Sequence, residues 1–113
     1  MNLRQLPNLK RLNLTNCTIN GNITLSNLQS IEQFVITNTK FNGDIIIQNN
    51  VAIDDFNFSN ISLHRVVFDG NDVNVKKLNF YKSIFSQNTI NINAIANNVE
   101  ELYFDYCQGL EHL

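Results

Sequence analysis

The residues best able to do acid–base or nucleophilic chemistry are few in this sequence and lie far apart. Its two histidines are His64 and His112, and only His64 has a hydroxyl nearby, that of Ser62 two residues before it. A nucleophile needs an adjacent base that a third group orients, and no third residue is evident. Zinc sites use closely spaced Cys and His, and no Cys or His pair here has a ligand spacing. We therefore expect no catalytic residue, no metal ligand, no cofactor and no enzymatic activity.

Charged residues occur instead as neighbouring pairs. Asp54-Asp55 and Glu100-Glu101 are acidic, whereas Lys10-Arg11 and Lys76-Lys77 are basic. Each pair directly precedes a triplet of the form apolar-x-apolar. Two interpretations stay open: the pairs are the solvated edge of a strand, or they form a charged column on a binding face.

Length and composition describe one β-rich domain. The chain has 113 residues, 43% of them hydrophobic and 16% charged, with a net charge of −2. It is rich in Asn, which favours turns, and in Ile, Val and Phe, which favour strands. The positive residues form no basic stripe, which argues against nucleic acid as a partner. No apolar run approaches the roughly 18 residues that span a bilayer, and the N-terminal residues lack the apolar core of a signal peptide, so we expect no membrane insertion.

The strongest pattern is an internal repeat. The apolar-x-apolar triplets begin at spacings of 22, 22, 22 and 24 residues, at Leu12, Phe34, Phe56, Leu78 and Leu102. Three residues before each triplet stands another apolar residue: Leu9, Ile31, Ile53, Val75 and Val99. Three residues after each triplet stand Cys17, Thr39, Ile61, Ser83 and Cys107. A fixed period of this length is typical of a solenoid, in which each triplet is a short strand with two inward side chains.

The repeat unit, L-x-x-L-x-L-x-x-(N/C/T)-x-L, resembles the leucine-rich-repeat consensus over nearly the whole chain. The segments 19–23 (INGNI) and 41–45 (FNGDI) resemble the turn of the plant-specific repeat class and are also similar to the FNIP class, whose repeats have the same length. Both lack the Pro that those classes have after the Ile, and the third repeat also lacks the Gly, so the subclass stays open. The resemblance implies a solenoid with a parallel concave sheet that recognises other proteins.

The second half of each repeat predicts another extended segment. Ile23, Ile45 and Val67 stand eleven residues after their triplets begin, with Ile90 one place further in the longer fourth repeat. Alternating apolar residues follow, which favours a strand over a helix. We therefore predict a mainly β leucine-rich-repeat solenoid with a mostly extended, non-helical convex side. The alternative is a convex side rich in helix, at its narrowest only around residues 93–98.

The domain is expected to span residues 1–113, as about five coils with the first and last incomplete. No cap is evident at either end, which favours a segment of a longer repeat array over a complete unit. The alternative is that the uncapped coils associate end to end.

The residues after the triplets are expected to hold the turns. Cys17, Thr39, Ser83 and Cys107 can each donate a hydrogen bond to a backbone carbonyl. Ile61 cannot, so the third coil should turn without that bond or with help from Asn60. Asn residues at equivalent positions of neighbouring coils can also hydrogen-bond to each other in ladders.

Both cysteines are expected to be free, buried thiols. Cys17 and Cys107 are four coils apart, roughly 19 Å at about 4.8 Å per coil, whereas a disulfide needs Cα atoms within about 7 Å. Free thiols favour a reducing compartment such as the cytoplasm. Five N-glycosylation sequons, two of which begin at Asn13 and Asn57 in the middle of their triplets, keep an extracellular location open.

The predicted concave face changes character along the stack. Outward positions of the first three coils carry mostly Asn, Thr and Ser, whereas the last two coils carry all three tyrosines among charged residues. The candidate binding residues are Tyr81, Tyr103, Tyr106, Lys77, Lys82, Glu101, Asp105 and Asn79. Tyr is enriched in binding hot spots, so we expect a module that binds a protein, whose identity the sequence does not indicate. The alternatives are that the rings cover the solenoid end, and that the chain is a structural spacer or self-assembling segment of a larger protein.

Overall fold

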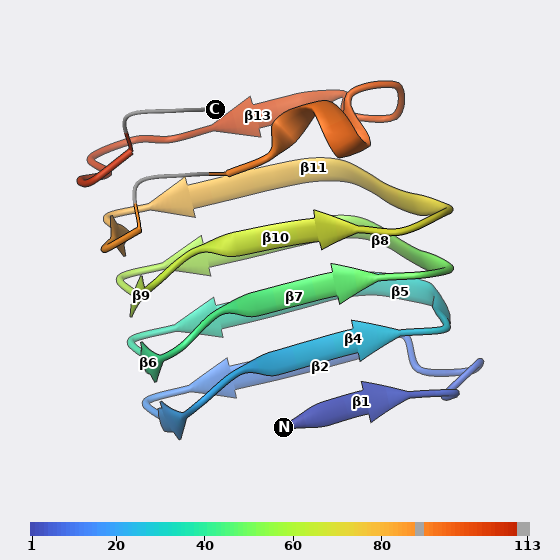
Figure 1. The fold of residues 1–113 in the computed structure, drawn as a ribbon, viewed down its shortest axis with the longest axis horizontal. Helices are drawn as coiled ribbons and strands as arrows, with labels where there is room; N and C mark the ends of the chain where they lie inside the picture. The colour runs from blue at the N-terminus through green and yellow to red at the C-terminus, as the bar shows by residue number, and fades with distance from the viewer. Residues whose placement is uncertain (88–89, 111–113) are drawn as a thin grey trace.

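The computed structural model describes residues 1–87 and 90–110, which form a solenoid of parallel β-strands (Figure 1). The first three coils each pass in turn through three sheets. The long sheet contains β2 (Arg11–Thr15), β5 (Leu28–Thr37), β8 (Val51–Ser59), β11 (Val73–Tyr81) and β13 (Glu101–Tyr103). The corner sheet contains β3 (Thr18–Asn20), β6 (Lys40–Asn42), β9 (Ser62–Leu63) and β12 (Ile84–Phe85). The return sheet contains β1 (Asn2–Arg4), β4 (Ile23–Ser26), β7 (Ile45–Gln48) and β10 (Val66–Asp69).

The predicted repeat register is confirmed in the long sheet. Its strands pair in parallel and align the first residues of the five triplets, Leu12, Phe34, Phe56, Leu78 and Leu102, in a single row. Parallel pairing places each residue beside its equivalent one coil away. The expected mainly β solenoid is therefore correct, and its second extended segment is the return sheet.

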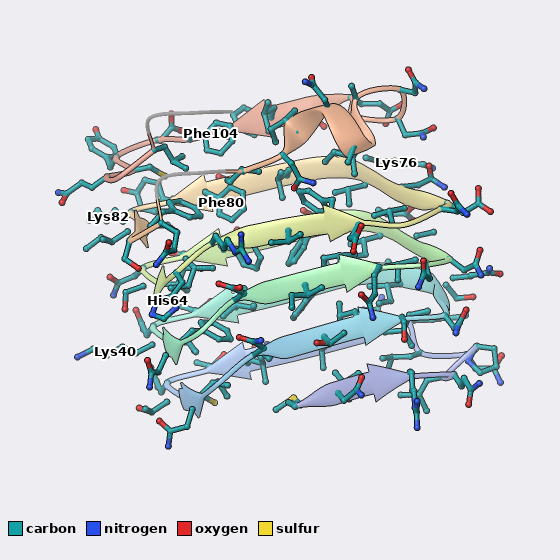
Figure 2. The ribbon with its side chains drawn as sticks, in the orientation of Figure 1. Lys40, His64, Lys76, Phe80, Lys82 and Phe104 are labelled. Carbon is teal, nitrogen blue, oxygen red and sulfur yellow. The ribbon has the colours of Figure 1, made fainter. Side chains whose placement is uncertain are left out.

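The core is a stack of aromatic rings between the long and return sheets. Phe34 and Phe56 stack with their ring centroids 4.7 Å apart, and Phe58 and Phe80 lie 4.6 Å apart. Phe104 continues the stack at 5.5 Å from Phe80 (Figure 2). The first four of these rings are completely buried. Aromatic pairs at such distances stabilise by about 1 kcal/mol beyond their area burial, so the stack joins the coils as well as filling them.

The return strand of the third coil differs from the prediction by one residue. Val66 aligns with Ile45 and is 1% exposed, whereas Val67 points outward and is only partly buried. The inward position therefore comes ten residues after Phe56, not eleven. The third corner lacks the Gly of the second, so one residue fewer separates Leu63 from Val66 than separates the equivalent pair in the second coil.

The residue that leaves each long-sheet strand adopts a left-handed backbone conformation. The five residues at this corner have φ between 50° and 58°: Asn16, Asn38, Asn60, Lys82 and Tyr106. Asn tolerates this conformation better than most residues, which explains its recurrence in the first three coils. The Asn60 side-chain amide also donates to the Asn38 side-chain oxygen at 2.6 Å, so part of the predicted Asn ladder is present at the corner.

The turn hydrogen bonds expected from the small residues are confirmed. Thr39 Oγ1 donates to the Thr37 carbonyl at 3.0 Å, and Ser83 Oγ donates to the Tyr81 carbonyl at 3.4 Å. Cys17 Sγ makes the same bond to the Thr15 carbonyl at 3.4 Å. Cys107 Sγ lies 2.9 Å from the Phe80 carbonyl and 3.9 Å from that of Asp105. The third corner has Ile61 at this position, which cannot donate to the turn carbonyl. The neighbouring Asn60 side chain donates instead to Asn38 of the second coil.

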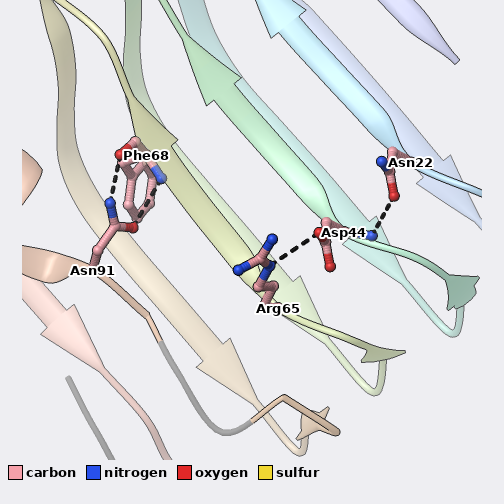
Figure 3. A network of polar contacts seen from close by, with 5 residues as sticks. All are labelled: Asn22, Asp44, Arg65, Phe68 and Asn91. Carbon is pink, nitrogen blue, oxygen red and sulfur yellow. Dashed lines mark hydrogen bonds and ion pairs between the residues drawn. The ribbon is translucent and has the colours of Figure 1, made fainter.

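One sheet edge is capped, contrary to expectation. The Asn91 side chain donates to the Phe68 carbonyl at 2.5 Å and accepts from the Phe68 N–H at 2.9 Å (Figure 3). Its amide thereby occupies the place of a further strand beside β10. A short 3₁₀ helix, η1 (Ile92–Ile95), follows. It overlaps residues 93–98, where a helix was the alternative prediction.

The corrected register of β10 can be tested with two matched substitutions. Val66→Ala removes buried methyl groups and should lower the free energy of unfolding by about 2 kcal/mol. Val67→Ala removes the same atoms from a partly exposed site and should cost clearly less. Urea denaturation of both variants measures the difference, and equal losses would contradict the inward position of Val66.

Candidate binding surface

The structure divides the predicted binding residues into two clusters on the outer face of the long sheet. The first, here called the ionic cluster, contains Lys77, Glu101 and Tyr103. Register places Lys77 beside Glu101, and their Nζ and Oε2 atoms lie 3.1 Å apart. The Tyr103 hydroxyl donates to Glu101 Oε1 at 2.8 Å. One carboxylate therefore contacts Lys77 across the boundary between β11 and β13 and Tyr103 within β13.

Mutual contacts shift the titration of the ionic cluster. The hydrogen bond from Tyr103, followed by that from Lys77, lowers the pKa of Glu101 from its ordinary value. The same carboxylate raises the pKa of Tyr103 and of Lys77. These side chains face water, so screening keeps the contribution of the pair to stability small. The cluster presents a fixed arrangement of a phenol, a carboxylate and an ammonium group.

The second cluster, here called the aromatic cluster, contains Tyr81, Tyr106 and Lys82. The rings of Tyr81 and Tyr106 meet edge to face with centroids 5.7 Å apart. Lys82 Nζ lies 5.4 Å from the centroid of Tyr81, within the range of a cation–π contact. Tyr81 is 37% exposed and Tyr106 is 76% exposed. The corner conformation of Lys82 and Tyr106 directs these long side chains outward at the point where the strands end.

The remaining two predicted residues contribute less to this surface. The Asp105 carbonyl accepts from the Lys82 N–H at 2.9 Å, which extends the strand pairing to the corner. Asn79 lies beside Tyr103 in register, and its side-chain oxygen is buried without a hydrogen-bond partner among the described residues. An incoming group could reach the Asn79 oxygen only after displacing the side chains that cover it.

A shallow groove of about 230 Å³ adjoins the aromatic cluster and was not predicted from the sequence. Its lining comes from the second to fourth coils: Asn38, Thr39, Lys40, Asn60, Ile61, Ser62, Lys82 and Ile84. Ile84 is 50% exposed, although the corner-sheet residues in the same row of earlier coils are polar. That change along the row, from Lys40 and Ser62 to Ile84, was the signal available in the sequence. Lys40 and Lys82 project from the corner side of the stack (Figure 2).

The charged pairs before the triplets bridge neighbouring coils. Lys76 Nζ lies 3.6 Å from Asp54 Oδ1, and Arg11 lies 3.7 Å from Glu32. All four side chains are about half exposed or more. The pairs are thus solvated, as one interpretation held. They also form ion pairs between the first and second coils and between the third and fourth, whereas the second and third coils place Glu32 beside Asp54.

Other chemical groups are sparse in residues 1–87 and 90–110. No cluster of three or more His, Cys, Asp or Glu within these ranges could hold a metal ion. Cys17 and Cys107 are free thiols, as predicted, but each is only partly buried, because both lie in the end coils. Burial raises the pKa of the Cys107 thiol, which lowers its reactivity near neutral pH. His112 lies outside the described residues, and no helix within them is long and apolar enough to cross a membrane.

Comparisons of the chain with protein-family models, curated proteins and solved structures found no match.

The ionic cluster predicts a measurable coupling between Glu101 and Tyr103. Glu101→Gln removes the negative charge that raises the pKa of Tyr103, so the phenol should titrate at lower pH than in the unaltered protein. NMR titration of the Tyr103 ring measures this shift. Glu100→Gln, one residue away, is the matched control and should leave the titration unchanged. An unchanged Tyr103 titration in Glu101→Gln would show that the hydrogen bond is absent.

Stability should depend weakly on the same carboxylate. Folding lowers the pKa of Glu101. Its contribution to the free energy of unfolding is therefore present above the unfolded-state pKa and is lost as the pH falls through the folded-state pKa.

Proposed function

We propose that this chain is a protein-recognition module of the leucine-rich-repeat type, with no enzymatic activity, and that it binds through the outer face of its C-terminal coils. The observation that carries the proposal is the exposed Tyr81–Tyr106 pair beside the groove around Ile84. Three large side chains that are 37%, 76% and 50% exposed lie close together at the end of the long-sheet strands. Exposed apolar groups gathered in this way often mark interaction sites in soluble proteins.

The chemistry of this surface favours a particular kind of partner. Tyr provides a large contact area at low entropic cost and is enriched in binding hot spots. Lys40 and Lys82 both line the groove and can pair with a carboxylate. We therefore expect an extended partner segment that places an apolar side chain over Ile84 and an acidic group between the two lysines.

The rigidity of the scaffold supports the same function. The aromatic cluster sits at corners that backbone hydrogen bonds from Asn60 to Tyr81 at 2.8 Å and from Lys82 to Asp105 at 2.9 Å hold in place. A binding site on such a scaffold loses little conformational freedom when its partner binds. A structural role as a spacer or self-assembling segment is the second candidate, and the chemistry of the two end coils favours it, as described below.

Substitutions in the aromatic cluster test the recognition proposal. Tyr81→Ala combined with Tyr106→Ala should weaken partner binding by at least about tenfold, since hot-spot residues contribute 2 kcal/mol or more. The immobilised chain and the variant are compared by quantitative capture of partners, followed by calorimetry with each purified partner.

Leu6→Ala is the control for this measurement, because it removes an exposed apolar side chain near the other end of the stack and should leave the affinity unchanged. Circular dichroism confirms that each variant is folded. Unchanged affinity in a folded Tyr81/Tyr106 variant would overturn the proposed surface.

A further inference from the structure

We propose that copies of this chain associate head to tail, with the exposed edge of β13 in one copy against the exposed edge of β2 in the next. These two strands are the outermost of the long sheet, and each pairs with only one strand among the described residues. Unpaired strand edges are templates for further pairing. The inference goes beyond the proposed recognition surface, because it uses the ends of the stack and not its outer face.

Charge makes the two ends complementary. The pair before the triplet is Lys10-Arg11 at the β2 end and Glu100-Glu101 at the β13 end. Alignment of Leu102 in one copy with Leu12 in the next places Glu101 beside Arg11 and Glu100 beside Lys10.

The internal coil boundaries show that this arrangement forms ion pairs. Oppositely charged residues at these two positions meet at three of the four boundaries of the long sheet: Arg11–Glu32 at 3.7 Å, Lys76–Asp54 at 3.6 Å and Lys77–Glu101 at 3.1 Å. The boundary between the second and third coils differs, because it places Glu32 beside Asp54. The proposed contact repeats this pattern between two copies.

The same charges disfavour the symmetric alternatives. Two β13 edges in contact would oppose acidic pairs, and two β2 edges would oppose basic pairs. All strand pairs in the solenoid are also parallel, and only a head-to-tail contact continues the sheet in that sense. A heterologous contact of this kind extends into an open chain of copies and does not close into a dimer.

Apolar surface is available at both ends. Leu102 of β13 is 39% exposed, whereas Leu78, its equivalent in the preceding coil, is completely buried. Leu12 and Leu14 of β2 and Phe104 are only partly buried. Contact between the ends would cover these side chains as an internal coil boundary does.

The end area is sufficient for a weak, specific contact. The molecule measures 32 × 29 × 19 Å, and its coils stack along the 29 Å direction (Figure 1). Each end covers at most 32 × 19 Å, so two whole ends in contact would bury at most roughly 1,200 Å², the lower limit for standard interfaces. Asn91 and η1 close the return sheet at the β13 end, so the long sheet carries the contact and the buried area is smaller, as in weak associations.

Charge reversal with rescue tests the proposal. We expect the weight-average mass of the unaltered chain to rise above 13.0 kDa as its concentration increases, measured by sedimentation equilibrium at low salt. K10E/R11E and E100K/E101K should each remain monomeric, because both ends then carry the same charge. The variant with all four changes should associate again.

This rescue separates an interface from a folding defect. The four changes together place like charges at the Arg11–Glu32 and Lys77–Glu101 contacts within the chain. If these residues acted only by stabilising the fold, the combined variant would therefore associate least. Circular dichroism verifies folding. Y81A should associate as the unaltered chain does, because Tyr81 lies one coil inside the end of the stack, so failure of the recognition proposal and failure of this one are distinguishable.

Cysteine crosslinking provides the geometric test. Head-to-tail contact brings Cys107 of one copy within about 4.8 Å of Cys17 in the next, inside the Cα range of disulfides. Mild oxidation with copper phenanthroline should yield Cys17–Cys107 linked peptides, and a mixture of C17S and C107S should stop at a crosslinked dimer. A chain that stays monomeric at every concentration, or that forms like-with-like disulfides as readily, would overturn the proposal.

Discussion

The structure depends on the hydrogen-bonded register of parallel strands, which places each residue beside its equivalent one coil away. In the long sheet this register aligns Leu12, Phe34, Phe56, Leu78 and Leu102. Because paired strands are about 4.8 Å apart, every such row is a column of side chains in mutual contact. Each row must therefore be chemically compatible from coil to coil, inside the molecule and outside it.

Core and surface follow from this one constraint. Inside, Phe rings stack from coil to coil, and the buried hydroxyl groups of Thr39 and Ser83 donate to turn carbonyls. At the corner, the row of Asn38 and Asn60 combines a left-handed backbone with a side-chain hydrogen bond between coils. Outward rows face solvent along their whole length. Such a row is a candidate for function where its chemistry changes, because the new side chain is not matched to its neighbours in the row and can contact a partner. Tyr81 after Ser59 and Ile84 after Ser62 are such changes.

The ends of the rows pose the remaining problem, since a strand edge without a partner leaves backbone groups unpaired. Asn91 caps the β10 edge of the return sheet, because one side-chain amide offers both the donor and the acceptor that a further strand would provide to Phe68. The long sheet has no such cap among its described residues. Its outermost strands carry opposite charges in the same row, so the chemistry that joins coils within the chain is also present at its two ends.

The sequence by itself determined the 22-residue repeat, the inward triplets and the turn bonds of residues such as Thr39, because a local period maps directly onto parallel stacking. Tertiary structure alone decided how many residues each corner uses, which is why Val66 and not Val67 points inward. It also separated the tyrosines, since Tyr103 reaches Glu101 while Tyr81 meets Tyr106. Those contacts depend on where side chains of neighbouring coils end in space, and no spacing along the chain encodes that position.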